Sequence, residues 1–387
     1  MPTIVSGVQY SGKWTKSQQM QAIAAGTWTG IPTPEIFAWG NNSDGQLGLG
    51  NTTNRSSPVQ VGALTTWAQT ASGQTHSLVT KNDGTLWAWG DNGQGALGQG
   101  NTTDRNSPVQ VGALTTWAEV AGGYLYSLAT TTDGKLYAWG YNGDGQLGLG
   151  NGVHISSPVQ VGALTTWSKI SAGYTSTYAI KTDGTLWAWG NNGQGGLGIG
   201  DTTNRNSPVQ VGALTTWAKV SGGKNFVVAL KTDGTLWSWG FNSSGQLGLG
   251  DTTNRNSPVQ VGALTTWTTL GPGQSRGQAI KTDGTLWVWG ADSYGALGIG
   301  ALGNRSSPVQ VGSLTTWLQV AGGYFFSLAT TTDGNLYAWG YNAQGQLGDG
   351  TTTSRNSPVQ IGSLTTWGTL PKMSTTGSSL VTTTTTT

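Results

Sequence analysis

Residues 115–150 read TTWAEVAGGYLYSLATTTDGKLYAWGYNGDGQLGLG, and a closely similar stretch returns every 50 residues along the chain. All tryptophans except Trp14 and Trp28 fall on three fixed positions of this unit. A sustained period of this length is typical of repeat architectures, in which each unit is one supersecondary element. The dipeptide Trp-Gly marks the period, at Trp39-Gly40, Trp89-Gly90, Trp139-Gly140, Trp189-Gly190, Trp239-Gly240, Trp289-Gly290 and Trp339-Gly340.

Each unit predicts four short strands, which in this copy cover 116–121, 126–131, 135–140 and 157–162. Asp133-Gly134 indicates a hairpin, because glycine accepts the positive φ of a type I′ turn. Side chains of KLYAWG, residues 135–140, alternate between two faces and are apolar on both. Such sheets fit blades stacked around an axis better than a solenoid, which needs polar caps at both ends. The prediction is an all-β, seven-bladed β-propeller with four strands per blade.

The two ends of the repeat array complement each other. The array begins at Ile36–Gly40 with the third strand of a unit, and the last unit stops after its first two strands. The simplest closure pairs N- and C-terminal strands in one blade. A competing arrangement takes Gln21–Gly26 as a first strand, but two prolines interrupt its path to Trp39. The predicted parts are an N-terminal extension over 1–35 as a candidate attachment segment, a propeller over 36–380 and a Thr-rich tail over 381–387.

Composition excludes several functions. Charged residues make up 9 % of the chain, against about a quarter in typical domains, and the net charge is only +2. This is too little for a nucleic-acid partner or an anionic membrane. Cysteine is absent, no apolar run has the length of a membrane span, and the N-terminus lacks the pattern of a signal peptide. We expect synthesis in the cytoplasm and no membrane insertion.

No catalytic constellation emerges. His76 and His154 lie in different repeats and are interpreted as polar loop residues. Most aspartates occupy the hairpin turn, where turn geometry explains them. The stretch 41–45 is rich in oxygen ligands, but equivalent stretches lack its carboxylate. We predict a non-enzymatic protein with no catalytic residue, no metal and no cofactor.

Two repeated residue types have both a structural and a functional interpretation. The framework tryptophans could stack on sugars, but core packing is favoured. An arginine ring could clamp an anion on the axis, or its guanidinium groups could satisfy carbonyls between neighbouring blades, which is favoured. The arginines are Arg55, Arg105, Arg205, Arg255, Arg305 and Arg355, with Ile155 in the remaining copy.

The strings YAWGYN, GQLGLG and SPVQVG resemble the regulator of chromosome condensation repeat family over residues 36–370. The resemblance implies a seven-bladed propeller. The founding member of that family is a guanine-nucleotide exchange factor for a small GTPase and docks on chromatin. Its exchange activity depends on a specialised insertion, whereas the Trp-Gly intervals here are uniform and no basic tail is present.

A second resemblance concerns residues 9–28, QYSGKWTKSQQMQAIAAGTW. This segment is similar to one placed ahead of repetitive domains in bacteriophage virion proteins. It makes Tyr10, Trp14 and Trp28 candidate attachment residues.

The copies differ mainly in two short windows, one after the Gly-Gly that ends the first strand and one after Trp-Gly. Drift is one explanation, and tuning for a partner is the other, because exposed loop aromatics are typical interface anchors. The candidate partner-binding residues are Tyr124, Tyr126, Tyr141, Tyr174, Phe226, Phe241, Tyr294, Tyr324, Phe325 and Tyr341.

These observations favour a structural or binding protein of a virion or other particle surface, such as a capsid decoration or a tail or fibre component. Its partner is predicted to be a protein of a larger assembly, or a host receptor or glycan. The alternatives are a lectin-like glycan binder, a guanine-nucleotide exchange factor and a cytoplasmic location.

Overall fold

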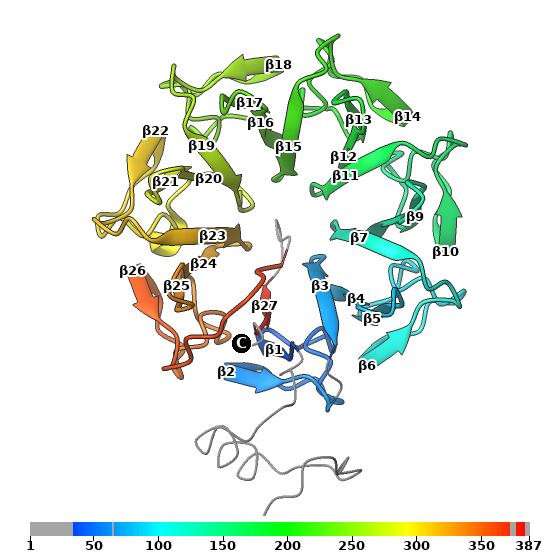
Figure 1. Ribbon diagram of the computed structural model, residues 1–387, viewed down its shortest axis with the longest axis horizontal. Coiled ribbons are helices and arrows are strands. Elements are labelled where there is room, and N and C mark those ends of the chain that lie inside the picture. The colour runs from blue at the N-terminus through cyan, green and yellow to red at the C-terminus, as the bar shows by residue number, and fades with distance from the viewer. Residues whose placement is uncertain (1–33, 64–65, 372–376, 384–387) are drawn as a thin grey trace, which may run out of the picture. The chain divides into compact units, whose positions relative to one another are not determined.

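The computed structural model describes residues 34–63, 66–371 and 377–383. Its strands form seven sheets arranged as blades around one axis (Figure 1). Six blades contain four antiparallel strands whose sheet order follows the chain. The predicted seven-bladed β-propeller is therefore confirmed.

The strands of blades 1 to 6 lie within one or two residues of the predicted bounds. In chain order they are β3 (Trp67–Ser72), β4 (His76–Lys81), β5 (Leu86–Gly90) and β6 (Arg105–Gln110); β7 (Trp117–Gly122), β8 (Tyr126–Thr131), β9 (Leu136–Gly140) and β10 (Ile155–Gln160); β11 (Trp167–Ala172), β12 (Ser176–Lys181), β13 (Leu186–Gly190) and β14 (Arg205–Gln210); β15 (Trp217–Gly222), β16 (Phe226–Lys231), β17 (Leu236–Gly240) and β18 (Arg255–Gln260); β19 (Trp267–Leu270), β20 (Arg276–Lys281), β21 (Leu286–Gly290) and β22 (Arg305–Gln310); β23 (Trp317–Gly322), β24 (Phe326–Thr331), β25 (Leu336–Gly340) and β26 (Arg355–Gln360).

Blade 7 closes the ring from both ends of the repeat array. It consists of β1 (Ile36–Gly40), β2 (Arg55–Gln60) and β27 (Ser378–Thr382), with β1 in the middle. The β1–β27 register runs from Ile36 opposite Thr382 to Gly40 opposite Ser378, and an isolated bridge joins Trp367 to Thr383. The predicted closure is confirmed. Because β27 reaches Thr382 and Thr383 forms the bridge to Trp367, three residues assigned to the Thr-rich tail, 381–383, lie in the propeller.

Parts of the prediction lie outside the described residues. They are the N-terminal segment with Tyr10, Trp14 and Trp28, the competing strand Gln21–Gly26, and the end of the tail, 384–387. In the described part of the chain, no helix has the length and hydrophobicity of a membrane span.

The core lies between blades, and the framework tryptophans build it. In blade 2, Trp139 is fully buried and donates its indole N–H to the Ala96 carbonyl of blade 1 at 2.8 Å. Trp117 packs against the Trp139 ring at a centroid distance of 6.2 Å. Gly98 has φ +69°, and a Cβ there would lie 2.9 Å from Trp139 Nε1, so glycine is required for this close approach. The same contacts recur around the ring, which supports core packing for these tryptophans.

The hairpin at Asp-Gly differs from the predicted type I′ turn. Only the glycine, Gly84 in blade 1, has positive φ, and its N–H donates to the Lys81 carbonyl at 2.9 Å. Asp83 instead accepts the main-chain N–H and the hydroxyl of Thr85, at 3.0 and 2.6 Å. This pattern is a type I turn followed by a glycine in the left-handed conformation. The hydrogen bonds that the Asp83 side chain accepts stabilise the right-handed conformation of the residue before that glycine.

The repeated arginines lie at the start of the outermost strands, far from the axis (Figure 1). Arg205 donates to the carbonyls of Thr203 and Asn204 and pairs with Asp201 at 2.5 Å, all within its own loop. The structural role is supported, but the expected partners in the neighbouring blade were wrong. The outermost strands also carry the repeated Ser-Pro, and proline on an edge strand opposes pairing with another sheet.

Candidate binding face

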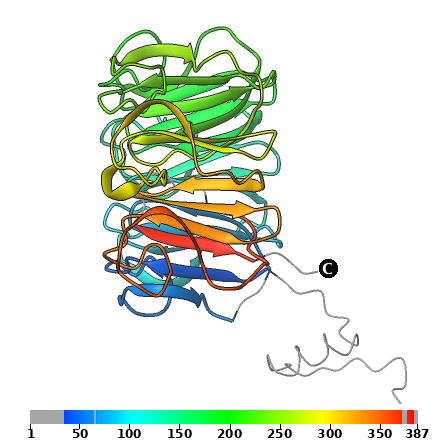
Figure 2. The same cartoon turned by 90° about the vertical axis from the view of Figure 1, so that its left-hand side faces the viewer.

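The two variable windows lie on one face of the propeller. Strand direction alternates within a blade, so the loops after the first and the third strand emerge on the same side (Figure 2). A hydrogen bond joins the two windows in each blade, for example from Tyr141 N–H to the Leu125 carbonyl at 2.8 Å and from Tyr341 N–H to the Phe325 carbonyl at 2.9 Å. We call this side, formed by the loops after the first and third strands, the variable face.

The first window also runs from blade to blade. The Tyr124 N–H donates to the Tyr174 carbonyl at 2.9 Å, and the Tyr174 N–H donates to the Gly223 carbonyl at 3.3 Å. Equivalent bonds join Gln74 to Gly123, Lys224 to Gln274 and Gln274 to Gly323. From blade 1 to blade 6, the variable residues of the first window are therefore mounted on a belt of main-chain hydrogen bonds.

Aromatic side chains of blades 2 and 3 form the first cluster on this face. Tyr124 and Tyr174 stack with their ring centroids 4.3 Å apart and their planes 23° apart. Tyr141 contacts Tyr124 and also His154, at centroid distances of 6.4 and 4.7 Å. Lys224 Nζ of blade 4 lies 5.1 Å from the Tyr174 ring centroid, a cation–π contact. We call Tyr124, Tyr141, His154, Tyr174 and Lys224 the Tyr124 cluster.

The second cluster comes from blades 5 and 6. Tyr294 lies 4.7 Å from Tyr341 and 5.5 Å from Phe325, measured between ring centroids. Tyr324 packs edge-on against Phe325 at 4.3 Å. Tyr294 sits in the short 3₁₀ segment η1 (Ser293–Gly295) with φ +60°, a left-handed conformation rare for an aromatic residue, and is 55 % exposed. We call Tyr294, Tyr324, Phe325 and Tyr341 the Tyr294 cluster.

An electrostatic interaction links the two clusters. The pKa of Tyr174 is raised by partial burial, by its hydrogen bond and electrostatic interaction with Tyr124, and by electrostatic interaction with Tyr324. Tyr324 belongs to the Tyr294 cluster.

Two predicted interface residues do not belong to the surface. Tyr126 and Phe226 are fully buried at the start of β8 and β16, and this part of the prediction was wrong. Tyr126 donates its hydroxyl to the Ser176 carbonyl of the next blade at 2.6 Å, and burial raises its pKa. Phe241 is half-buried on the variable face, and its N–H donates to the Asn225 carbonyl.

Sequence reasoning also missed residues in the long loops after the third strand. Val153 and Leu302 replace a threonine of the common loop and are 60 % and 68 % exposed. They lie in the loops of blades 2 and 5 that also carry His154 and Tyr294. The sequence feature that could have found them is the departure of GVHI (152–155) and LGNR (302–305) from the usual TTNR. His154 accepts the Asn142 N–H at 3.0 Å in its loop, but His76 is a buried strand residue, contrary to prediction.

A buried arginine supports the Tyr294 cluster from below. Arg276 of blade 5 is fully buried, and its guanidinium donates to the carbonyls of Gly323, Tyr324 and Phe326 in blade 6. Burial lowers its pKa to about 9, an effect that the charge of Asp292 opposes, so it remains charged at neutral pH. Asp292, in turn, accepts the N–H groups of Leu297 and Gly303.

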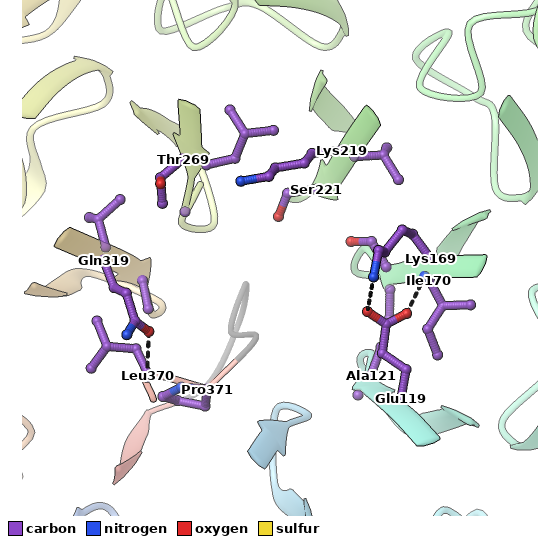
Figure 3. Close-up of a pocket in the computed structure, with 18 of the residues that line it drawn as sticks. Glu119, Ala121, Lys169, Ile170, Lys219, Ser221, Thr269, Gln319, Leu370 and Pro371 are labelled. Atoms are coloured by element: carbon purple, nitrogen blue, oxygen red, sulfur yellow. Dashed lines mark hydrogen bonds and ion pairs between the residues drawn. The ribbon is translucent and has the colours of Figure 1, made fainter. Parts of the chain in front are cut away.

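A cavity of about 330 Å³ lies on the propeller axis, among the innermost strands (Figure 3). Glu119 accepts the Ile170 N–H at 2.9 Å and lies 3.9 Å from Lys169 Nζ. Lys219 donates to the Thr268 carbonyl at 2.6 Å, and Gln319 accepts the Leu370 N–H at 3.0 Å. Burial, together with Lys169, lowers the pKa of Lys219. Each of these side chains ties its own blade to the next, so the axial polar groups serve closure of the ring.

Among the described residues, no three His, Cys, Asp or Glu side chains are grouped to hold a metal ion. In this part of the chain, the variable face is the candidate site: it carries the two aromatic clusters, and a pocket lies between the Tyr294 cluster and blade 7. The fold is a propeller in which loops build the variable face.

The chain belongs to the regulator of chromosome condensation (RCC1) repeat family. The model of that repeat matches residues 35–80, 83–130, 133–180, 183–230, 233–271, 283–330 and 333–368, which is most of the chain. A second model of the same repeat matches five segments between 67 and 346.

Solved structures share the fold. The chain is similar to yeast RCC1 (Prp20) bound to Kap60, with a TM-score of 0.82 and 21 % identity over 100 % of this chain and 97 % of that chain. Prp20p of Saccharomyces cerevisiae, studied for its binding to Gsp1p and histones, gives 0.80 and 21 % over 92 % and 93 %. Human WBSCR16 gives 0.80 and 19 % over 92 % and 100 %.

Proposed function

We propose that this protein is a non-enzymatic binding propeller whose variable face contacts a protein partner through the Tyr124 cluster. One observation carries the proposal. In a chain of nearly identical repeats, the substituted positions gather on one face, and the aromatic ones contact each other across blades. Independent drift of single loops gives no reason for such contacts, whereas a shared partner does.

The chemistry of the cluster suits a protein surface. Tyrosine supplies a large apolar ring with little conformational entropy to lose, and a hydroxyl for hydrogen bonding. The stacked pair of Tyr124 and Tyr174 is pre-organised by the main-chain bond beneath it. Lys224 adds a cation at the edge of the cluster. A relative with the same fold, Prp20p, binds proteins, which agrees with this class of partner.

The test uses the purified protein as bait on extracts of its source, with bound proteins quantified by mass spectrometry. The double variant Tyr124→Ser/Tyr174→Ser should lose a specific partner at least tenfold. Leu214→Ser is the matched control, because Leu214 is 46 % exposed in the connection to β15, on the opposite face. Equal capture by both variants, or no specific partner, contradicts the proposal.

A small GTPase is the second candidate partner, since Prp20p binds Gsp1p and shares the fold. The Trp-Gly intervals are all 50 residues, so the repeats contain no specialised insertion of the kind on which exchange activity depends in the founding member. Release of a fluorescent guanine nucleotide from a small GTPase, with and without the protein, separates the two candidates. Acceleration favours the exchange factor.

We further propose a location on the surface of a virion or similar particle. Support comes from the sequence of residues 9–28, which lie outside the described residues, and from the scarcity of charge. Sedimentation of particles followed by immunodetection tests this location. Recovery of the protein only in the soluble fraction contradicts it.

A further inference from the structure

A pocket of about 340 Å³ opens on the variable face where blades 6 and 7 meet. One part of its lining is aromatic, and another part is polar. Its volume lies at the lower end of the ~300–1,000 Å³ typical of small-molecule sites. The walls relevant here are Tyr294, Phe325 and Tyr341 on the aromatic side, and Asn41, Asp44 and Gln344 on the polar side.

The aromatic wall is specific to this part of the ring. Tyr294 stands where the other copies have Asp, Gln or Ser, and Phe325 where they have Thr, Leu, Asn or Ser. Tyr294 is more than half exposed, although the ring contacts both Phe325 and Tyr341. Arg276 holds the turn that carries Phe325 through main-chain carbonyls. Arg276 therefore holds the aromatic wall in place, and the Tyr294 ring at the edge of this wall is exposed to solvent.

The polar wall presents a carboxylate and amides in fixed positions. Ser43 Oγ lies 2.9 Å from both Asn41 Oδ1 and Asp44 Oδ2, and its single O–H donates to one of them at a time. Gln46 Nε2 donates to Asn41 Oδ1 at 3.0 Å. Within the described residues, Asp44 Oδ1 and Asn41 Nδ2 have no hydrogen-bond partner. An acceptor and a donor are thus held ready for a ligand.

The charge of the lining selects among ligands. Asp44 is the one charged side chain among the described residues that line the pocket, and none of them is Lys, Arg or His. A phosphate, sulfate or carboxylate would meet a like charge without compensation. A ligand with one apolar face and a rim of neutral hydroxyls satisfies both walls, whereas an apolar peptide side chain satisfies only the aromatic one.

We propose that this pocket binds one or two residues of a neutral carbohydrate. The C–H face of a pyranose ring packs on Tyr294 and Tyr341, and its hydroxyls bond to Asp44, Asn41 and Gln344. This proposal rests on the proposed function only in that both use the variable face, and it concerns the other cluster.

The experiment is an array of neutral, sialylated and sulfated glycans probed with the purified full chain, followed by calorimetry with the best neutral oligosaccharide. Neutral glycans should bind. Tyr294→Ala and Asp44→Asn should each weaken binding at least tenfold, and Tyr294→Trp should retain it. Leu214→Ser, on the opposite face, should bind like the parent chain.

Several results would overturn the proposal: no binding of neutral glycans, a preference for acidic ones, binding that Tyr294→Ala leaves unchanged, or Tyr294-dependent binding of a peptide library instead. Circular dichroism establishes that each variant is folded. Because the array contains no protein partner, its outcome is independent of the partner-capture experiment, and either proposal can fail alone.

Discussion

Arg276 donates a hydrogen bond to the main-chain carbonyl of Tyr324, 3.3 Å away in the next blade. In other copies this strand-start position holds His, Tyr, Ser or Phe. Arginine alone carries enough donors to reach three carbonyls of one turn at once. A buried residue with no access to solvent therefore shapes the surface of the Tyr294 cluster.

Replacing Arg276 with Met should lower the free energy of unfolding by about 2 kcal/mol, because buried carbonyls lose a charged donor. Arg205→Met is the control. Its ion pair with Asp201 lies at the rim and is worth less than about 1 kcal/mol. Urea denaturation measures the free energy of unfolding of both variants. Equal losses would contradict a specific stabilising role for Arg276.

Asp292 should be energetically coupled to Arg276. Asn occupies the Asp292 position in every other copy, and the charge of Asp292 opposes the effect of burial on the pKa of Arg276. Asp292→Asn should therefore cost more stability in the parent chain than in Arg276→Phe, which restores the residue found in two other blades. A double-mutant cycle should give about 1–2 kcal/mol, and strict additivity would refute the coupling.

His76 should make stability depend on pH below neutrality. Burial lowers its pKa from 6.5 to about 4, partly offset by Asp91. Between pH 6.5 and pH 4, His76 therefore binds a proton in the unfolded chain but stays neutral in the folded chain. The free energy of unfolding should fall by about 3 kcal/mol as the pH drops from 6.5 to 4.

His76→Phe is the matched variant, because Phe226 and Phe326 occupy the same position. Urea denaturation between pH 7 and pH 4 should show a smaller decline in this variant. Parallel curves for the two proteins would mean that His76 does not titrate in this way.

A disulfide should show how much ring closure contributes. Ala38 lies opposite Leu380 across β1 and β27, and the chain has no cysteine. Oxidised Ala38→Cys/Leu380→Cys should be more stable than its reduced form, because the bond links nearly the whole ring into one loop.

The repeat provides the control for that disulfide. Leu128 and Ala138 lie opposite each other at the equivalent positions of one hairpin in blade 2, so the control variant is Leu128→Cys/Ala138→Cys. The chain-entropy model gives the ring-closing bond about 3 kcal/mol more than the hairpin bond. Thermal unfolding under oxidising and reducing conditions compares the two, and equal gains would contradict a special role for blade 7.

The period and the incomplete end units predicted the fold because every blade repeats one packing problem. The buried Tyr126 and Phe226 could have been recognised from the same pattern. In β8, Tyr126 and Leu128 share one face of an alternating strand, so Tyr126 belongs to the core. The prediction counted it with the loop because its identity varies between copies.

The aromatic clusters could not be predicted as clusters. That Tyr124 stacks on Tyr174 depends on the angle between adjacent blades and on the hydrogen-bonded belt, neither of which appears in the spacing. The position of Tyr294 depends on its left-handed backbone conformation, which the sequence Asp-Ser-Tyr-Gly does not predict. Arg276 was overlooked because a single charged residue in a variable window suggests a side chain exposed to solvent.

The pairing of Ile36 with Thr382 has a mechanical consequence. The chain enters β1 and leaves β27 at the same end of their ladder, so tension that pulls the two ends apart loads one residue pair at a time. The ladder then peels open like a zipper instead of resisting as a whole in shear. Blade 7 would yield at low force, while the other six blades, each made from one continuous segment, would carry none of that load.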